Sequence, residues 1–292
     1  MKFSFILPES LPSMTVKRLL EDYFLIPRKI RHFLRTKKHL WVNQKEVNWQ
    51  SLVQPGDELT LFFDDQDYPD KDLLLGEANL VEELYQDQHL IVVNKPEGMK
   101  THANQPTELA LLNHVSAYVG QTCYVVHRLD KETSGAVLFA KNPFVLPVLN
   151  RLLEKRQIKR EYWALVEQAF QQREAIFREP IGRDRHDRRK RRVDPKQGKR
   201  ALTRVSRLKN FPHQALLKCQ LETGRTHQIR VHLAHHDHPL VGDPLYNPHK
   251  GPRLMLHAHR LRFIHPFSQK EICLEAPSAS FEAQIQLLKN KG

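Results

Sequence analysis

A polar segment held between two apolar runs constrains the fold more than any other part of the chain. One apolar run ends at Val126, and a second extends from Ala136 to Ala140. Short apolar runs bounded by turn residues predict buried strands, and Gly135 marks the entry into the second one. The loop between the two strands carries Asp130. Because rigid strands hold both of its ends, this loop is a favourable place for a reactive group.

The charges around Asp130 indicate how its carboxylate could act. Arg128 and Lys131 lie close to it in the sequence. Nearby cations keep a carboxylate ionised, and an ionised carboxylate is available as a nucleophile rather than as an acid. The alternative is an ion pair on a surface turn. For an isolated Arg-Leu-Asp tripeptide that alternative is the better one, since exposed ion pairs contribute little to stability.

A longer string favours the catalytic interpretation. Residues His127 to Gly135, His-Arg-Leu-Asp-Lys-Glu-Thr-Ser-Gly, resemble the signature of the RluA-like RNA pseudouridine synthases. Other motifs of that family are resembled, in the same order along the chain, by Asn94 to Met99, Lys159 to Val166, Gly198 to Thr203, Leu221 to Tyr246 and His257 to Pro266. The resemblance implies that the chain converts uridine to pseudouridine in RNA. It also implies that Asp130 is the catalytic residue, which either attacks C1′ or assists the departure of the base.

Two more residues join Asp130 in the predicted catalytic group. The same resemblance implies that Arg230 pairs with the catalytic carboxylate. It implies that Tyr162 stacks on the target base, and Tyr162 could also serve in removing the proton from C5. No cofactor is expected, because the isomerisation involves no redox change.

The sequence around Tyr162 supports a position at a buried site. Tyr162, Ala164 and Val166 share one face of a predicted strand, while Trp163 and Leu165 share the other. Both faces are therefore expected to be buried. A Tyr in a strand is more often a plain core residue. A buried Tyr hydroxyl needs a hydrogen-bond partner, however, and a charged Asp–Arg site would supply one.

A further set of residues is predicted to bind the RNA substrate: Arg128, Arg160, Arg225, His227, Gln228, Arg188, Arg189 and Arg191. The last three belong to residues 181–200, the most basic segment of the chain. This segment has almost no apolar content and is not expected to form core. We expect a solvated loop in the free protein that becomes ordered when its arginines contact RNA phosphates.

The formal net charge of +13 indicates a polyanionic partner, and nucleic acid is the first candidate. An anionic membrane surface is less favoured, because no basic amphipathic helix with Trp or Phe on its apolar face is evident. No run approaches the roughly 20 apolar residues of a membrane span. The start of the chain does not resemble a signal peptide. We therefore expect a cytoplasmic protein whose partner is RNA and that does not bind membranes.

Cysteines and histidines do not predict a metal site. Cys123, Cys219 and Cys273 each lie in an apolar run and are expected to be reduced core residues. His227 and His232 are five positions apart and diverge on a helix. The remaining histidines of this dense region are His235, His236 and His238. Neither Cys nor Glu stands at ligand spacing from them, so a metal-dependent hydrolase is the weaker alternative.

Helical patterns accompany the predicted strands. One covers residues 109–119, and another covers 143–157. Pro147 is expected near the start of the second regular helix, since Pro is tolerated in a first turn and not in the interior. Thr226 is expected to cap the helix that carries Arg230.

The N-terminal part, residues 1–63, resembles the S4-type RNA-binding domain. Two short helices between Met14 and Arg35, the second rich in basic residues, precede small strands. The family form has a Gly where Gln44 or Lys45 stands, so the match is divergent. The alternative is a small α/β cap with a solvated basic face.

The predicted domain order is this S4-like domain, an acidic linker at residues 64–78, and a catalytic domain at residues 79–292. The expected fold class is α+β. It combines a large mixed, mainly antiparallel β-sheet with flanking helices, the pseudouridine synthase fold, and a small N-terminal S4-like α/β domain.

Ribosomal RNA of the 23S type is the favoured target, transfer RNA is possible, and a monomer is expected. The alternative function is a non-catalytic RNA-binding or ribosome-assembly protein. It would explain the charge but would leave Asp130 and Arg230 without a purpose.

Overall fold

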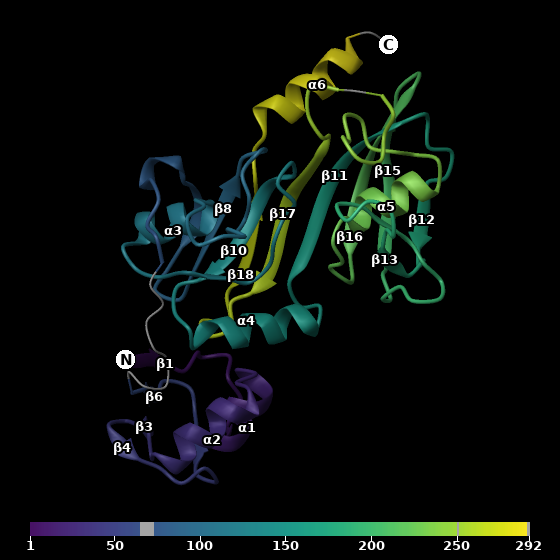
Figure 1. Cartoon of the computed structure of the whole chain (residues 1–292). Coiled ribbons are helices and arrows are strands. Elements are labelled where there is room, and N and C mark those ends of the chain that lie inside the picture. Colours follow the sequence, from purple (N-terminus) through teal and green to yellow (C-terminus); the bar gives the residue numbers. More distant parts are fainter. Residues whose placement is uncertain (65–72, 250, 291–292) are drawn as a thin grey trace.

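The computed structural model describes residues 1–64, 73–249 and 251–290 and contains two main β-sheets of unequal size (Figure 1). Elements β1 to β6 form what we call the N-terminal module. They are β1 (Lys2–Ile6), β2 (Met14–Thr15), α1 (Val16–Arg18), the π-helical turn η1 (Leu19–Tyr23), α2 (Arg28–Thr36), β3 (Leu40–Val42), β4 (Lys45–Glu46), β5 (Leu52–Val53) and β6 (Glu58–Phe62). Most of the predicted linker, at residues 65–72, lies outside the described residues.

The remaining elements form what we call the C-terminal part of the chain. They are η3 (Ala78–Leu80), β7 (Glu82–Gln86), β8 (Leu90–Lys95), α3 (Leu111–Val119), β9 (Tyr124–Val125), β10 (Ser134–Ala140), α4 (Val145–Glu154), β11 (Lys159–Glu167), β12 (Glu174–Phe177), β13 (Ile181–Arg183), β14 (Arg191–Val193), β15 (Thr203–Asn210), β16 (Gln214–Leu221), α5 (Gln228–His235), β17 (Leu256–Ile264), β18 (Glu271–Glu275) and α6 (Ala279–Lys289).

The large sheet has ten strands among the described residues. Its main path is β12-β15-β16-β11-β17-β10-β8-β7, with β18 beside β17 and β9 beside β10. Its neighbours pair antiparallel except β10 and β17, which run parallel. Helices flank the sheet, as Figure 1 shows for α3, α4 and α5. The expected α+β class and the mixed, mainly antiparallel sheet are confirmed.

Strand β11 is buried on both faces, as its alternation predicts. Tyr162, Ala164 and Val166 pack into one hydrophobic cluster with residues of β10 and β16. Leu165, with Trp163 against it, packs into a separate cluster that includes residues of α6. This strand therefore forms the wall between two cores, and Tyr162 lies on the side of the Asp130 loop.

Gly135 allows the close approach of β10 and β17 just after the Asp130 loop. Its φ is +115°, and a Cβ at this position would lie 2.3 Å from the carbonyl oxygen of Ala258. Any side chain would push the two strands apart. The glycine thus fixes where the loop enters the sheet.

One expectation about local structure is confirmed and another is wrong. Helix α4 begins at Val145, and Pro147 lies in its first turn, where no backbone donor is needed. Cys273 is exposed, whereas Cys123 and Cys219 are buried as predicted. In β18 the neighbouring Ile272 takes the buried face, so the alternation of the strand turns Cys273 outward. Within the described residues, no helix is long and apolar enough to cross a membrane.

An aromatic cluster joins the N-terminal module to the C-terminal part. The ring of Phe144, just before α4, lies 5.2 Å from that of Phe3 and 4.9 Å from that of Phe63. Phe5 contributes a further contact, 5.2 Å from Phe267. One hydrophobic cluster runs across this junction without a break. Figure 1 shows α4 between the module and the large sheet.

We predict that Phe144→Ala lowers the free energy of unfolding by about 3–5 kcal/mol, because it removes a fully buried ring and leaves a cavity. Urea unfolding followed by circular dichroism measures this change. Leu208→Ala is the control; Leu208 is 46% exposed, so the change should stay within about 0.5 kcal/mol. A decrease smaller than about 1 kcal/mol in Phe144→Ala would contradict a tightly packed junction.

Candidate active site

A cavity of about 450 Å³ opens beside the Asp130 loop, β11 and the start of α5. All three predicted catalytic residues line it, namely Asp130, Tyr162 and Arg230. So do most of the predicted RNA-binding residues: Arg128, Arg160, Arg225, His227 and Gln228. Points about a hundred residues apart in the chain therefore meet at one cavity, since Asp130 and Arg230 are separated by 100 positions.

Hydrogen bonds to its backbone hold the Asp130 loop in place. The Thr101 hydroxyl donates to the carbonyl of Leu129 at 2.9 Å and accepts from the Leu129 N–H at 3.1 Å. The N–H of Gly98 donates to the carbonyl of Lys131 at 2.9 Å. The residues on both sides of Asp130 are thus held, which fixes the origin of its side chain.

Lys95 explains why a lysine stands in the Asn-Lys-Pro string. Its side chain is fully buried, and its ammonium donates to the carbonyls of Pro96, Met99 and Lys131. Burial lowers the pKa of Lys95 to about 7, although the charge of Asp130 opposes the shift. The role is architectural, because the ammonium gathers three backbone oxygens under the loop.

Arg230 connects two carboxylates. It is 1% exposed, and its Nε and Nη2 donate to the two oxygens of Asp243 at 2.8 and 2.7 Å. Its remaining nitrogen, Nη1, lies 3.4 Å from Oδ2 of Asp130. Burial alone would lower the pKa of Arg230, but the hydrogen bonds and charge of Asp243, with the charge of Asp130, raise it. The guanidinium is therefore a fixed positive charge beside Asp130.

Asp130 itself stays accessible. Its side chain is 23% exposed, in contrast to the almost complete burial of Arg230. A carboxylate that is open to the cavity and lies beside a buried cation is reachable by a ligand. This arrangement supports the expected Asp130–Arg230 pair.

Tyr162 lies on the cavity wall and is 4% exposed. Burial raises the pKa of its hydroxyl above the usual value, Arg160 acts in the opposite sense, and Asp130 adds to the rise. The phenol therefore stays protonated near neutral pH. Among the described residues, no hydrogen bond joins its hydroxyl to Asp130. The position of Tyr162 favours a ring on which a ligand could stack over a hydroxyl that acts as a general base.

His227 faces Asp130 from the other side. Its Nε2 lies 3.8 Å from Oδ2 of Asp130, and its Nδ1 lies 2.8 Å from the hydroxyl of Tyr246. Burial lowers the pKa of His227 below its usual value. The imidazole is therefore largely neutral at pH 7.

The start of α5 differs from the expectation. His227, not Thr226, is the residue before the helix, and its φ of 57° is left-handed. The chain turns here because the side chain of Gln228 accepts hydrogen bonds from Thr223 and from the N–H of Arg225. The prediction of Thr226 as the cap is wrong, because this side-chain network replaces a Thr cap.

Gln228 uses its amide inside the protein. Besides the two bonds that it accepts, it donates to the carbonyl of Leu202 and the hydroxyl of Thr203. It is 2% exposed. These contacts give Gln228 a structural role at the cavity; its contact with RNA stays a prediction.

Several polar groups around the cavity lack partners. Among the described residues, Arg128, Arg160 and Arg225 form no ion pair, although the Nε of Arg225 donates to the carbonyl of Arg200 at 3.0 Å. The buried atoms His127 Nδ1, Thr133 Oγ1 and Arg160 Nε have no hydrogen-bond partner there either. Their residues all line the cavity. Buried polar atoms are rarely left unpaired, so these groups are suited to a polar ligand.

The basic segment 181–200 is not a disordered loop. Strands β13 and β14 pair in a short hairpin, which we call the basic hairpin. Ile181 is buried against Ala201 and Val231, so the segment also contributes to a small core. Both findings correct our expectation.

Two aspartates explain the order of the basic hairpin in the free protein. Asp184 accepts the N–H groups of His186 and Asp187. Asp187 in turn accepts from the backbone and guanidinium of Arg189. These bonds close the hairpin tip without RNA.

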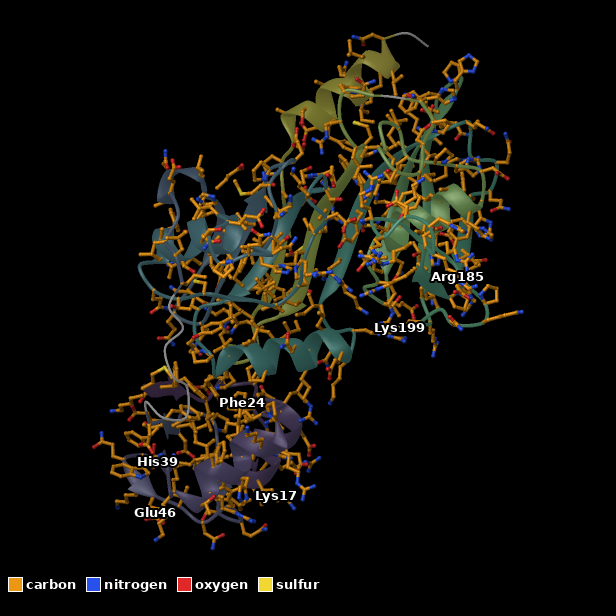
Figure 2. All side chains as sticks on the ribbon, viewed as in Figure 1. Lys17, Phe24, His39, Glu46, Arg185 and Lys199 are labelled. Carbon is orange, nitrogen blue, oxygen red and sulfur yellow. The ribbon has the colours of Figure 1, made fainter. Side chains whose placement is uncertain are left out.

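The hairpin arginines differ in what they offer to a ligand, and none of them lines the cavity. Arg189 pairs with Asp187, and Arg191 turns its guanidinium to the carbonyls of Arg188 and Lys190. Among the described residues, Arg188 forms no ion pair. Figure 2 marks Arg185 and Lys199, which belong to the basic segment 181–200. RNA contact by Arg188, Arg189 and Arg191 stays a prediction.

The histidines are used for packing and hydrogen bonds. His232 contacts the Thr203 hydroxyl at 2.8 Å and the Glu179 carbonyl at 3.0 Å. His236 stacks on Phe177 with ring centroids 4.1 Å apart. In the part of the chain that the structure describes, no group of three or more His, Cys, Asp or Glu side chains could hold a metal ion.

Asp243 and Tyr246 are functional candidates that sequence reasoning did not single out. Both lie in the string 221–246 that carries the family resemblance. A signal was available, since a buried arginine requires a carboxylate partner in addition to a catalytic one that must stay reactive. The sequence offers Asp243 next to a Gly-containing turn.

Comparison with known proteins agrees with this geometry. Residues 89–235 match the RNA pseudouridylate synthase family, and residues 3–59 match the RluD ribosomal pseudouridine synthase N-terminal domain. The chain is 38% identical over 248 residues to the uncharacterized RNA pseudouridine synthase YhcT of Bacillus subtilis, which covers 81% of this chain and 80% of that protein. It is 41% identical over 217 residues to ribosomal large subunit pseudouridine synthase D of Neisseria meningitidis serogroup A, covering 66% of this chain and 57% of that one.

A solved structure shares the fold. Human RNA pseudouridylate synthase domain containing 1 superposes with a TM-score of 0.60 at 24% identity, covering 73% of this chain and 96% of that one. The family match, the extent of the relatives and the shared fold agree with the ordered motifs of the sequence. The chain belongs to the RNA pseudouridylate synthase family, as its resemblance to the RluA-like members predicts, and is an enzyme that isomerises uridine to pseudouridine in RNA.

Proposed function

We propose that Asp130 is the catalytic carboxylate of this uridine isomerisation and that Arg230 and Tyr162 complete its site. The observation that carries the proposal is the contact of Asp130 with a buried arginine that a second carboxylate holds in place. Electrostatic groups fixed before the reaction stabilise developing charge without reorganisation.

The reaction needs a negative charge near the sugar. The N1–C1′ bond of uridine breaks, the base turns, and a C5–C1′ bond forms. A proton leaves C5 and a proton arrives at N1, so substrate and product are isomers. Asp130 supplies a carboxylate where C1′ becomes electron-deficient, whether it attacks C1′ or assists departure of the base.

Arg230 holds that carboxylate in its orientation. Because two of its nitrogens are bound to Asp243, only Nη1 is directed at Asp130. Tyr162 offers its ring as the surface on which the uracil stacks, which fits its position on the cavity wall. Stacking leaves the base free to turn in its own plane.

A uridine within a helix or stacked loop must leave its stack to reach Asp130, at a cost of a few kcal/mol. Polar groups that lack partners in the free protein can offset part of this cost by binding the extruded nucleotide. Arg128 lies on the exposed side of the Asp130 loop and suits the phosphates. Arg160 and Arg225 also line the cavity.

The N-terminal module supplies a second RNA contact in this proposal. A hollow of about 490 Å³ on its surface is lined by Lys17, Arg28, Arg35 and Trp49, with other polar residues. None of the three cations forms an ion pair among the described residues; Figure 2 marks Lys17. Basic residues beside an aromatic ring suit phosphates and a stacked base. This supports the S4-like interpretation of residues 1–63 over a plain cap.

Ribosomal RNA of the large subunit is the target that we favour, with transfer RNA as the competing one. The support is similarity to proteins named ribosomal large subunit pseudouridine synthase D. The same proposal places the enzyme in the cytoplasm and treats it as a monomer, with residues 64–78 as the linker between its domains.

A non-catalytic RNA-binding or ribosome-assembly protein is the rival function. The contact between Asp130 and Arg230 argues against it. Binding RNA alone gives no reason to hold a carboxylate in a cavity that otherwise attracts phosphates.

We predict that Asp130→Ala abolishes pseudouridine formation, to below about one part in a thousand, while RNA affinity changes little. The reason is that the carboxylate acts on the reacting sugar and repels phosphates. Single-turnover assays with tritium release from C5-labelled RNA measure the rate, and filter binding measures affinity. Glu154→Gln is the control, because Glu154 lies on the rim of the same cavity. Turnover above that limit would remove Asp130 from the catalytic role.

Cells that lack the gene should lose one or more pseudouridines from large-subunit ribosomal RNA. The wild-type gene should restore them, and the Asp130→Ala gene should not. Pseudouridine mapping of total RNA measures this. Loss confined to transfer RNA would reject the ribosomal target, and unchanged maps would support the non-catalytic alternative.

Replacing Arg188, Arg189 and Arg191 by Gln should flatten the salt dependence of RNA affinity, by about one unit of log–log slope for each phosphate that the protein no longer neutralises. Binding measured across a salt series tests this. The matched control is Arg260→Gln with Arg262→Gln, whose guanidiniums pair with Glu275 and Glu271. An equal slope in wild type and in the triple variant would exclude the basic hairpin as a phosphate-binding element.

A further inference from the structure

A chain of polar contacts links the basic hairpin to Asp130. The backbone N–H of Arg191 donates to the hydroxyl oxygen of Tyr246 at 2.7 Å. That hydroxyl lies 2.8 Å from Nδ1 of His227, whose Nε2 lies 3.8 Å from Oδ2 of Asp130. The chain begins at the hairpin that carries the arginines and ends at the catalytic carboxylate.

The proton positions along this chain follow from hydrogen-bond chemistry. Burial raises the pKa of Tyr246 to about 12, so its hydroxyl keeps its proton. Because the oxygen already accepts from Arg191, the hydroxyl proton is free to point to Nδ1 of His227. A neutral imidazole that accepts at Nδ1 carries its proton on Nε2. The proton then faces Asp130.

Charges on every side of His227 agree with a neutral ring. After burial, the largest influence, the carboxylates of Asp130 and Asp243 raise its pKa, and the guanidiniums of Arg230 and Arg191 lower it. The outcome is a lowered pKa. Arg230 already provides one fixed cation beside Asp130, so protonation of His227, which would add a second cation, is not favoured.

The backbone of His227 is held in an uncommon conformation. Its φ is 57°, and it directly precedes α5. Strained backbone is retained where the surroundings determine it, and often at functional sites. Here the left-handed turn places the imidazole between Tyr246 and Asp130, with the side chain 12% exposed.

We propose that His227 is a positioning residue for Asp130, and that Tyr246, whose hydroxyl oxygen accepts the N–H of Arg191 in the basic hairpin, holds the imidazole of His227 in the Nε2–H tautomer. The inference rests on the proposed catalytic role of Asp130. It extends that role by making the orientation of the carboxylate depend on the element that carries the RNA-contacting arginines.

Both donors approach the same oxygen of Asp130. Arg230 Nη1 lies 3.4 Å and His227 Nε2 lies 3.8 Å from Oδ2. Among the described residues, Oδ1 has no hydrogen bond or ion pair. Two donors on Oδ2 leave Oδ1 for the sugar. A separation of 3.8 Å is too long for a hydrogen bond, and catalytic contacts of this kind shorten when substrate fills the site.

Tyr246 also contacts the other donor. Its ring lies 5.2 Å from the guanidinium carbon of Arg230, and its N–H donates to Asp243. Tyr246 is therefore one side chain that contacts both donors of Asp130, His227 and Arg230.

The test combines NMR with kinetics. Nitrogen-15 shifts of the full-length protein should show His227 in the Nε2–H tautomer. Tyr246→Phe should abolish this single tautomer and lower the single-turnover rate about 10- to 100-fold, the range for one hydrogen bond to a charged group. His227→Asn, which tolerates a left-handed backbone, should lower the rate similarly. RNA affinity should stay within about twofold in Tyr246→Phe, which removes only the hydroxyl.

His235→Ala is the control, since His235 is exposed on the same helix and should leave the rate and the tautomer unchanged. An Nδ1–H tautomer in the wild type would overturn the proposal. So would wild-type rates in Tyr246→Phe. Failure of the proposed role of Asp130 is distinguishable, because Asp130→Ala would then keep its rate of pseudouridine formation while the tautomer of His227 in the wild type could still be read.

Discussion

The bidentate contact between Arg230 and Asp243 is the interaction on which the site depends. Both side chains are about 1% exposed, and losing one partner would leave a buried, uncompensated charge at a cost of about 3–5 kcal/mol. The contact fixes the plane of the guanidinium. Because that plane is fixed, the one remaining nitrogen has a single direction, and that direction meets Asp130.

The backbone around Asp243 explains how a loop residue can be oriented for the bidentate contact with Arg230. Gly242 has a φ of +68°, and a Cβ there would lie 2.0 Å from the carbonyl oxygen of Arg253. Asp243 then accepts the N–H groups of Leu245 and Tyr246. Local turn chemistry thus orients one carboxylate, that carboxylate orients an arginine, and the arginine sets the electrostatics of another carboxylate far away in sequence.

The sequence predicted those parts of the site that follow from hydrophobic periodicity or from long family motifs. The alternation in β11 identified a strand with two buried faces, and the string around Asp130 identified the loop. The Asp243 contact was missed, because an ion pair between a helix and a loop has no period. The order of the basic hairpin was missed for a related reason. The many arginines of the segment dominate its charge composition, but its order depends on Asp184 and Asp187. Their turn-forming hydrogen bonds follow from where these two residues stand and not from how many acidic residues the segment has.

Helix α4 relates the two RNA-contacting regions of the proposal. Phe144, just before its first residue, packs against the N-terminal module, and Leu153 and Glu154 near its far end line the cavity. A helix of ten residues spans about 15 Å. The aromatic junction and this helix thus set the separation between the hollow that contains Trp49 and the cavity that contains Asp130. RNA that engages both sites need not order the protein first, so less binding free energy is lost to ordering and more remains to extrude the uridine.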